Sequence, residues 1–289
     1  MKIANDWKDY SVLACGDGEK LERWGEYILL RPDPQVIWHW QNKPLVKPHA
    51  HYHRSDKGGG EWEYFKPLPQ QWSVKWRDLT FLIKPMGFKH TGLFPEQAVN
   101  WQQMIDMISS VRRPVNVLNL FAYTGGATAA CAYAGASVCH VDSAKNMVER
   151  AKENLAASGL AQKPVRYIVE DCQKFLTREI KRGNFYDAII MDPPSYGRGP
   201  NGEMWKIEEN LFDFLTLCAK VLCPKPLFVL INSYTTGLQP LVLKNLLSIV
   251  LKDFEGSCEA YEVALPTQQE GIYLPCGASA MFKGKGKGE

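Results

Sequence analysis

One short segment constrains the fold of this chain more than any other. Residues 188–191 (Ala-Ile-Ile-Met) predict a buried β-strand, and Asp192, Pro193 and Pro194 follow at once. Two consecutive prolines cannot continue a hydrogen-bonded ladder, so the chain must turn there. We therefore expect the Asp192 carboxylate at the carboxyl end of a buried strand, which is where open α/β sheets bind their ligands.

The same segment suggests a chemical task. A carboxylate and a proline carbonyl can accept both hydrogens of a planar amine, while an aromatic ring stacks on its heterocycle. Asp192 would then orient a nitrogen nucleophile, and Tyr196, two residues after the prolines, would shape the pocket. The alternative is a strand that ends in a proline turn with a solvated aspartate.

A second strand with a glycine turn lies upstream. Residues 115–121 predict the strand and residues 127–134 predict a helix. Such a unit cradles nucleotides. The G-x-G-x-x-G fingerprint and the lysine-containing phosphate loop are absent, which argues against NAD, FAD and that type of ATP hydrolysis. The turn holds four candidate cofactor-binding residues, Tyr123, Thr124, Gly125 and Gly126.

Two further predicted strands also end in acidic residues. Residues 137–141 lead into Asp142, whose carboxylate is placed to accept the ribose hydroxyls of an adenosine-containing cofactor. Ser143 is expected to cap the following helix. Residues 165–169 lead to Asp171 at the adenine edge, followed by Cys172. We expect Ser143, Asp171, Cys172 and Asp192 to take part in binding the cofactor together with Asp142.

These four strand ends, in this order, resemble the class I S-adenosylmethionine-dependent methyltransferases. The resemblance covers roughly residues 95–289 by the placement of domain elements. It implies a doubly wound, Rossmann-like α/β sheet with S-adenosylmethionine as the cofactor. The eight scattered cysteines favour reduced thiols and therefore a cytoplasmic enzyme.

Residues 118–125 and 192–196 are similar to the branch that contains several large-subunit ribosomal RNA methyltransferases. That similarity implies an RNA partner, with ribosomal RNA as the leading choice. Residues 89–97 are similar to a segment that this branch carries before the glycine turn, with an inserted His and a Glu where Asp is usual. Within it, Phe94 and Gln97 match positions that border the cofactor pocket.

The cysteines bear on the atom that is methylated. Methylation of a pyrimidine at C5 needs a thiolate to add to the ring first. The relatives that do this carry cysteines just after the strand that follows the Asp-Pro-Pro turn, whereas the matching residues 227–238 contain none. This favours a nitrogen target or a substrate unlike that of the relatives. Asn232 in this stretch is expected to line the pocket, and Cys172 and Cys223 are expected to be structural thiols.

Composition fits an enzyme of two parts. The 289 residues carry a net charge of +3, which permits an RNA partner without demanding one. The chain has no apolar run long enough to cross a bilayer and no C-x-x-C pair. Eight of nine tryptophans fall within the first 101 residues, among short β-like runs at 26–30, 35–40, 72–76 and 80–83. We therefore expect a small β-rich domain over residues 1–92 and a methyltransferase domain over residues 93–289 that opens with a helix at 95–110.

Two features of the first domain leave alternatives. Its tryptophans can stack on RNA bases, although they more often form the core of a small domain. His49, His51 and His53 alternate and would share one face of a strand. We expect a solvated loop with no metal instead, because residues 57–60 (Lys-Gly-Gly-Gly) adjoin them and the sequence places no acidic second shell nearby.

The leading function is therefore S-adenosylmethionine-dependent methylation of a base nitrogen in ribosomal or other structured RNA. The alternatives are methylation of a protein or small molecule, and a cofactor-binding module without catalysis. Nothing in the pattern specifies an oligomeric state.

Overall fold

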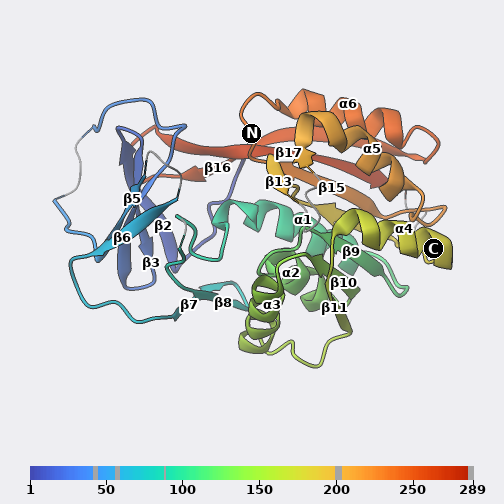
Figure 1. Cartoon of the computed structure of the whole chain (residues 1–289), viewed down its shortest axis with the longest axis horizontal. Helices are drawn as coiled ribbons and strands as arrows, with labels where there is room; N and C mark the ends of the chain where they lie inside the picture. Colours follow the sequence, from blue (N-terminus) through green and yellow to red (C-terminus); the bar gives the residue numbers. More distant parts are fainter. Residues whose placement is uncertain (42–44, 56–58, 88, 199–203, 286–289) are drawn as a thin grey trace. The chain divides into compact units, whose positions relative to one another are not determined.

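The computed structural model describes residues 1–41, 45–55, 59–87, 89–198 and 204–285 (Figure 1). The chain divides into two compact units. The larger unit consists of Met1, Asn100–Glu262 and Gly277–Glu289, and the smaller unit consists of Lys2–Val99 and Val263–Cys276. The domain boundary expected after residue 92 stays a prediction.

The larger unit is a sheet with helices on both of its faces. Its strands, in spatial order, are β16 (Gly256–Pro266), β17 (Tyr273–Gly284), β15 (Phe228–Ser233), β12 (Ala188–Met191), β9 (Asn116–Leu120), β10 (Ser137–Asp142) and β11 (Val165–Val169). Its helices are α1 (Ala98–Ser109), α2 (Gly126–Tyr133), α3 (Lys145–Ala157), α4 (Cys172–Arg182), α5 (Ile207–Ala219) and α6 (Pro240–Val250). A short hairpin of β13 (Tyr196–Arg198) and β14 (Met204–Lys206) precedes α5.

The order of the strands creates a switch point between β9 and β12. From β9 the chain proceeds outward through β10 to β11, all parallel, and then crosses to β12 on the other side of β9. β15 is parallel to β12, whereas β17 is antiparallel to β15. Because the connections leave β9 and β12 in opposite directions, their carboxyl ends border a crevice of the kind that binds ligands. The fold is the doubly wound α/β sheet that the sequence predicts.

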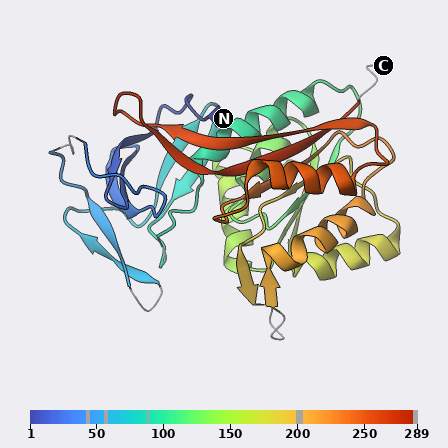
Figure 2. The ribbon, with the colours of Figure 1, turned by 90° about the horizontal axis from the view of Figure 1, so that it is seen from above.

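The two faces of the sheet differ in chemistry. Alternate strand residues such as Leu120, Ile189 and Met191 enter one large apolar core with residues of α4, α5 and α6. These three helices follow one another along that side of the sheet in Figure 2. The intervening residues include Asn119 and His140, which are buried polar side chains. The second face therefore depends on internal hydrogen bonds as well as on apolar packing.

The smaller unit is β-rich, as expected. A five-stranded sheet is formed by β2 (Tyr10–Gly16), β3 (Glu19–Trp24), β4 (Tyr27–Pro32), β5 (Ala50–Arg54) and β6 (Gly60–Tyr64). A hairpin joins β7 (Trp72–Trp76) to β8 (Leu79–Ile83), β1 (Lys2–Ile3) pairs with the end of β16, and η1 (Pro95–Gln97) is a short 3-10 helix.

The strand expected over residues 35–40 is wrong. The carbonyls of Val36 and Trp38 accept from the backbone N–H groups of Gly18 and Asp17 at 2.7 Å. These two donors belong to the turn between β2 and β3. The segment therefore packs against a turn instead of joining a ladder.

The tryptophans of this unit belong mainly to its own framework. Trp24 and Trp76 are among the largest fully buried side chains. Five indole N–H groups donate to acceptors within the unit at 2.7–3.2 Å, those of Trp7, Trp38, Trp62, Trp72 and Trp76. Of the two alternatives for these residues, the structure favours the core.

Candidate functional site

The turn after β9 has a strained backbone. Phe121 and Tyr123 adopt φ values of 53° and 50°, and Gly125 adopts 82°. Only glycine adopts such angles without steric cost, and a non-glycine residue there costs on the order of 1–3 kcal/mol. Strain of this size persists only where the surroundings enforce it, and it is concentrated at ligand sites.

Asp142, at the end of β10, braces this turn. Its Oδ2 accepts from the backbone N–H of Tyr123 and its Oδ1 accepts from that of Ala144, both at 2.8 Å. Burial raises the pKa of Asp142, and the two backbone hydrogen bonds oppose that rise. The carboxylate thus lies next to the turn, as the sequence predicts, and it also fixes the turn's conformation.

The two glycines are required by helix packing. A Cβ on Gly125 would lie 2.8 Å from the Cβ of Ala151 in α3, and a Cβ on Gly126 would lie 2.7 Å from the ring of Trp101 in α1. Real Cβ contacts are longer, so a side chain at either position would force the helices apart. The glycines therefore let the start of α2 approach its neighbours closely.

A chain of buried polar groups supports the same turn from below. The Asn119 amide donates to Thr128 Oγ1 at 2.9 Å, and this hydroxyl is 2.9 Å from His140 Nδ1. Burial lowers the pKa of His140 to about 4, so the imidazole is neutral at physiological pH. These hydrogen-bonded side chains link β9, α2 and β10 directly beneath the glycine turn.

The predicted residues after β10 and β11 have mixed outcomes. Ser143 is exposed, and Ala144 is the N-cap of α3, so the expected Ser143 cap is wrong. Asp142 accepts from the N–H of Ala144, the residue directly before the first residue of α3. Asp171 caps α4 by accepting from the Lys174 N–H at 2.9 Å.

Cys172 is a buried thiol beneath the turn. Its sulfur accepts from the Phe121 N–H at 3.3 Å, and burial raises its pKa. Cys223 lies near the start of β12, where its thiol is 3.5 Å from Asp187 Oδ1, and burial raises its pKa too. The carboxyl end of β12, which carries Asp192, is the opposite end of that strand.

The Asp192 segment follows β12 as predicted and is held from two sides. The Trp205 indole donates to the Pro194 carbonyl at 2.6 Å, and Ser195 Oγ is 2.6 Å from Thr235 Oγ1 after β15. The Met191 position pairs with Leu120, so Asp192 emerges beside the turn that follows β9. The Trp205 N–H thus takes up one acceptor position of the Pro194 carbonyl.

Trp205 and Thr235 are site residues that the sequence did not single out. The Trp205 ring contacts those of Phe121 and Phe214, with centroids 5.7 and 5.5 Å apart, so it joins the two turns. The sequence did offer a sign of Trp205, because it is the only tryptophan after residue 101. Tyr196 lies in β13 with half of its surface exposed.

Asn232 occupies a buried network. Its Oδ1 accepts from Asn100 Nδ2 at 3.0 Å and from Ser279 Oγ at 2.7 Å, and Tyr261 donates to Asn100 Oδ1 at 2.6 Å. These bonds join α1, β15, β16 and β17. They give Asn232 a structural role, and its role in lining a pocket stays a prediction.

Phe94 and Gln97 belong to the smaller unit. Gln97 is buried at the end of η1, and the ring of Phe94 is 5.5 Å from that of His90. Their approach to the cofactor stays a prediction.

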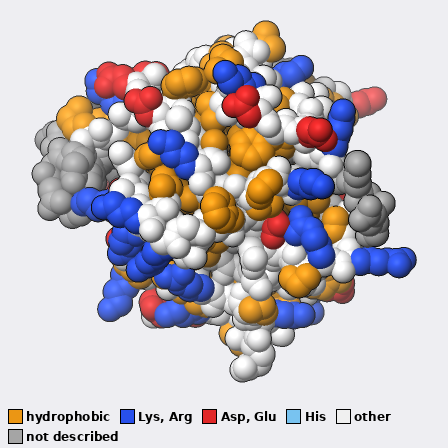
Figure 3. All heavy atoms as spheres, turned by 90° about the vertical axis from the view of Figure 1, so that its right-hand side faces the viewer, with side chains coloured by type: hydrophobic (Ala, Val, Ile, Leu, Met, Phe, Trp, Pro, Cys, Tyr) orange, Lys and Arg blue, Asp and Glu red, His pale blue; other side chains and the backbone are white. Residues whose placement is uncertain are grey.

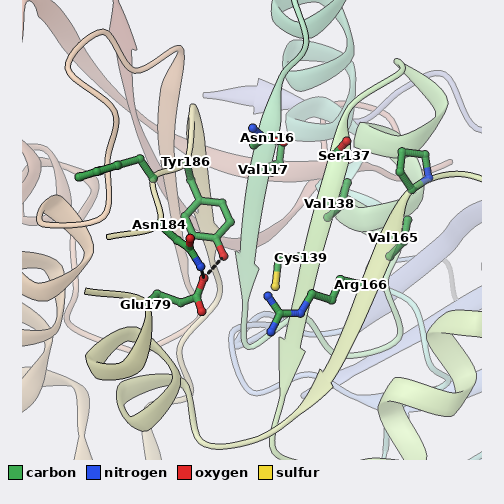
Figure 4. Close-up of a pocket in the computed structure, with 12 residues that line it drawn as sticks. Asn116, Val117, Ser137, Val138, Cys139, Val165, Arg166, Glu179, Asn184 and Tyr186 are labelled. Carbon is green, nitrogen blue, oxygen red and sulfur yellow. Dashed lines mark hydrogen bonds between the residues drawn. The ribbon is translucent and has the colours of Figure 1, made fainter. Parts of the chain in front are cut away.

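A cavity of about 460 Å³ lies at the amino ends of the strands, on the side of the sheet away from the glycine turn (Figure 4). Residues from the amino ends of β9, β10 and β11 line it, including Asn116, Ser137 and Val165. Its acidic residue, Glu179, accepts from Tyr186 at 2.7 Å and from Asn184 at 2.9 Å. Burial would raise the pKa of Glu179, but these hydrogen bonds lower it overall. The cavity therefore surrounds a satisfied structural carboxylate at the edge away from the glycine turn.

The fold and the site define the class of protein. A doubly wound sheet with an acid-braced glycine turn at its switch point is the arrangement expected of class I methyltransferases. A family model described as S-adenosylmethionine-dependent methyltransferase matches residues 35–230, which is more than half of the chain. The chain belongs to this family.

Solved structures of S-adenosylmethionine-dependent methyltransferases have the same fold as this chain. An S-adenosylmethionine-dependent methyltransferase from Agrobacterium tumefaciens is 32% identical with a TM-score of 0.92, and the match covers 98% of this chain and 93% of that one. A candidate S-adenosylmethionine-dependent methyltransferase from Streptococcus mutans is 16% identical with a TM-score of 0.75, over 96% of this chain and 76% of that one. The second likeness concerns the fold alone.

Curated relatives share part of the sequence. The ribosomal RNA large subunit methyltransferase K/L of Shewanella frigidimarina is 30% identical over 53% of this chain and 21% of its own length. The protein of the same name from Vibrio cholerae is 27% identical over 61% of this chain and 24% of its own length. The chain thus spans about a quarter or less of the length of these relatives.

Within the residues that the structure describes, no helix has the length and apolar character needed to cross a membrane.

Proposed function

We propose that this chain transfers a methyl group from S-adenosylmethionine to a base nitrogen in structured RNA, with ribosomal RNA as the leading substrate. One observation carries the proposal. The Asp142-braced turn after β9 and the Asp192 segment after β12 lie at adjacent strand ends, because Leu120 and Met191 are register partners. This adjacency supports a cofactor site at the turn beside a carboxylate, Asp192, that would orient the nucleophile, both at the switch point of one sheet.

The residues at the first strand ends fit an adenosyl cofactor. Each oxygen of Asp142 accepts one backbone N–H and keeps further acceptor capacity for a ribose hydroxyl. The turn would border the methionine part of the cofactor, and Asp171 and Cys172, after β11, would border the adenine. The bound cofactor supplies an electrophilic methyl group on a sulfonium. The positions of the turn and of Ser143 at this edge are compatible with the same assignment.

Asp192 and the Pro193 carbonyl would hold the substrate. They would accept the two hydrogens of a planar amine, which directs its lone pair toward the methyl group. Tyr196 would stack on the base, which requires the nucleotide to be unpaired or flipped. The protein's contribution is orientation, so the reaction needs no covalent intermediate with the enzyme.

The thiols support a nitrogen target. A C5-methylating enzyme needs a reactive thiolate beside the substrate. Cys172 lies in the core with its thiol bonded to the backbone, and Cys223 lies at the amino end of β12. Burial keeps both protonated. Residues 227–238 contain no cysteine.

Exposed positive charge and the named relatives both support an RNA partner. On the side of the larger unit drawn in Figure 3, Lys and Arg side chains gather in one region with few acidic side chains among them. In this unit α4 exposes four cations, Lys174, Arg178, Lys181 and Arg182, of which Arg178 and Arg182 also form ion pairs with Glu170 and Glu179. Exposed cations attract the phosphate backbone without regard to sequence. The relatives named above are ribosomal RNA methyltransferases, and a cytoplasmic location accords with such a substrate.

The test is transfer of a labelled methyl group from S-adenosylmethionine to RNA isolated from cells that lack the protein. We expect label in one RNA species, released on digestion as an N-methylated nucleoside. Asp192→Ala should lower turnover on the order of 100-fold or more, as the loss of a positioned polar group does. Asp213→Asn, an exposed carboxylate on α5, serves as the matched control and should retain the wild-type rate.

Each other outcome contradicts a defined part of the proposal. Label in protein or in small molecules, and none in RNA, would show that the substrate is not RNA. Cofactor binding without transfer to any cellular fraction would identify a non-catalytic module. Wild-type turnover by Asp192→Ala would remove its assigned role.

A further inference from the structure

The smaller unit carries a cluster of histidines and glutamates that the methyltransferase site does not use. His51 and His53 lie on β5, two residues apart, so both side chains point to the same face of the sheet. Their rings are 3.9 Å apart between centroids. The expectation of a solvated loop at these histidines is wrong, because residues 50–54 pair with β4 and β6.

Acidic residues from two other strands meet these histidines. Glu63 on β6 is the register partner of His51, and its Oε2 is 2.8 Å from His53 Nε2. Glu19 on β3 brings Oε1 to 2.6 Å from His51 Nε2. The absence of nearby acids expected from the sequence is therefore wrong, because strand pairing supplies them from 10 and 32 residues away.

The ligand atoms are close enough to share one ion. One nitrogen of each histidine and one oxygen of Glu63 all lie within 4.8 Å of one another. Glu19 adds a fourth group, through its contact with His51. Metal–ligand bonds of about 2.0–2.2 Å separate neighbouring ligand atoms by roughly 3.3 Å, so small rotamer changes would close the shell.

The chemistry of this donor set favours zinc. Imidazole and carboxylate groups bind Zn²⁺ with tetrahedral geometry, and imidazole favours such borderline metals over Ca²⁺ or Mg²⁺. Two carboxylates balance the charge of the ion. In the metal-free arrangement each Nε2 makes a hydrogen bond with a carboxylate oxygen, and an ion would take the place of these two bonds.

His49 does not belong to the cluster. Its Nδ1 accepts from the Ile28 N–H at 3.0 Å, which fixes it as part of the connection that leads into β5. His51 and Glu19 are 18% and 25% exposed at their side chains, whereas His53 and Glu63 are about half exposed. One side of the site is thus rigid and the other is open to an incoming ion.

We propose that His51, His53, Glu63 and Glu19 form a zinc site that links β3, β5 and β6 of the smaller unit. The ion stabilises this unit because it ties together strands distant in sequence, and binding to the folded state alone raises the free energy of unfolding. The site is independent of the proposed methyl transfer.

The test uses the full chain after removal of metals with a chelator. Calorimetry with zinc chloride should give one equivalent bound and a higher melting temperature. Replacement of zinc by Co²⁺ should give the visible absorption of a tetrahedral site with nitrogen and oxygen ligands. The thiolate charge-transfer band that cysteine ligation produces should be absent.

The variants separate ligands from bystanders. His51→Gln and His53→Gln should each weaken zinc binding by on the order of tenfold or more, and His53→Gln keeps the fold because its side chain is half exposed. His39→Gln is the matched control, since His39 Nδ1 makes a similar 2.6 Å contact with Asp17 in the same unit, and it should bind zinc like the wild type. Absence of zinc binding, a thiolate signature, or undiminished binding in both cluster variants would overturn the proposal.

Discussion

The environment of Cys172 illustrates how one residue limits the chemistry of this site. Its position directly after Asp171, at the edge where the cofactor is proposed to bind, would suit a nucleophile. Its thiol instead accepts the backbone N–H of Phe121 and is buried in the core, which raises its pKa. A protonated, hydrogen-bonded thiol is a poor nucleophile.

We therefore expect no covalent intermediate. RNA that contains 5-fluorocytosine traps enzymes whose thiolate adds to the pyrimidine ring, because the fluorine blocks release. Incubation of the protein with such RNA and S-adenosylmethionine should give no adduct that survives denaturing electrophoresis. A stable adduct that disappears in Cys172→Ser or Cys223→Ser would refute the nitrogen target.

A buried ion pair in the smaller unit makes the stability of that unit depend on pH. Glu22 is fully buried and accepts from Arg31 Nε at 2.6 Å and from Tyr10 at 2.7 Å. Burial alone would raise its pKa, but Arg31, Lys20 and these hydrogen bonds lower it to about 2, from an ordinary value of 4.5. The ion pair therefore stabilises the unit fully above pH 4.5, and this contribution is lost as the pH falls from 4.5 toward 2.

Glu22→Gln should destabilise the smaller unit by about 3–5 kcal/mol at pH 7, since it leaves Arg31 buried without its partner. The difference from the wild type should shrink as the pH is lowered toward 2. Urea unfolding followed by tryptophan fluorescence measures this, because most tryptophans lie in that unit. Glu26→Gln, at an exposed position, is the control. A difference that persists undiminished at the lowest pH would contradict the account.

At the scale of elements, the start of α2 shows how packing and function depend on the same residues. Gly126 allows α2 to approach Trp101 of α1, and the turn that precedes it adjoins Asp142. An alanine there would favour the helix by about 1 kcal/mol on propensity alone. The 2.7 Å contact with the indole ring outweighs that gain, because neighbouring helices are closely packed.

Gly126→Ala should lower the free energy of unfolding by about 1–3 kcal/mol and weaken cofactor binding at the same time. Thermal denaturation and calorimetry of the purified variant test the two effects. Gly87→Ala, where an added Cβ meets no atom within 4 Å, should change neither. A Gly126→Ala protein of wild-type stability and affinity would show that the turn tolerates displacement of α2.

The elements with strong local signals were predictable from the sequence. The strand at 188–191 is β12 with the same limits, and the strand at 165–169 is β11. Their apolar character and the residues that end them are local features. The Ser143 cap was wrong because α3 begins one residue later than expected, with Ala144 as its N-cap.

Features that depend on distant pairing were not predictable. Asn232 has partners 132 and 47 residues away, and these contacts exist only once α1, β15 and β17 have assembled. Glu19 and Glu63 reach the histidines of β5 through the pairing of strands. Likewise Trp205 meets the Pro194 carbonyl only through the β13–β14 hairpin.

At the scale of the whole chain, the candidate site residues at the strand ends and most of the tryptophans lie in different units. The larger unit contains Asp142, the glycine turn and Asp192, whereas most tryptophans belong to the smaller unit. The account depends most on the claim that the carboxyl edge of the larger unit binds S-adenosylmethionine through Asp142. The cavity at the amino edge is the competing location within that unit.

Calorimetric titration of S-adenosylmethionine into the wild type and into Asp142→Ala tests this claim most directly. The wild type should bind one equivalent, and the variant should lose about 1–3 kcal/mol of binding free energy, since its partners lose a buried acceptor. Asp142→Asn, which keeps the shape of the side chain, should show a loss in the same direction, and Asp213→Asn should bind normally. Unchanged affinity in a folded Asp142→Ala protein would contradict the account and direct attention to the opposite edge of the sheet.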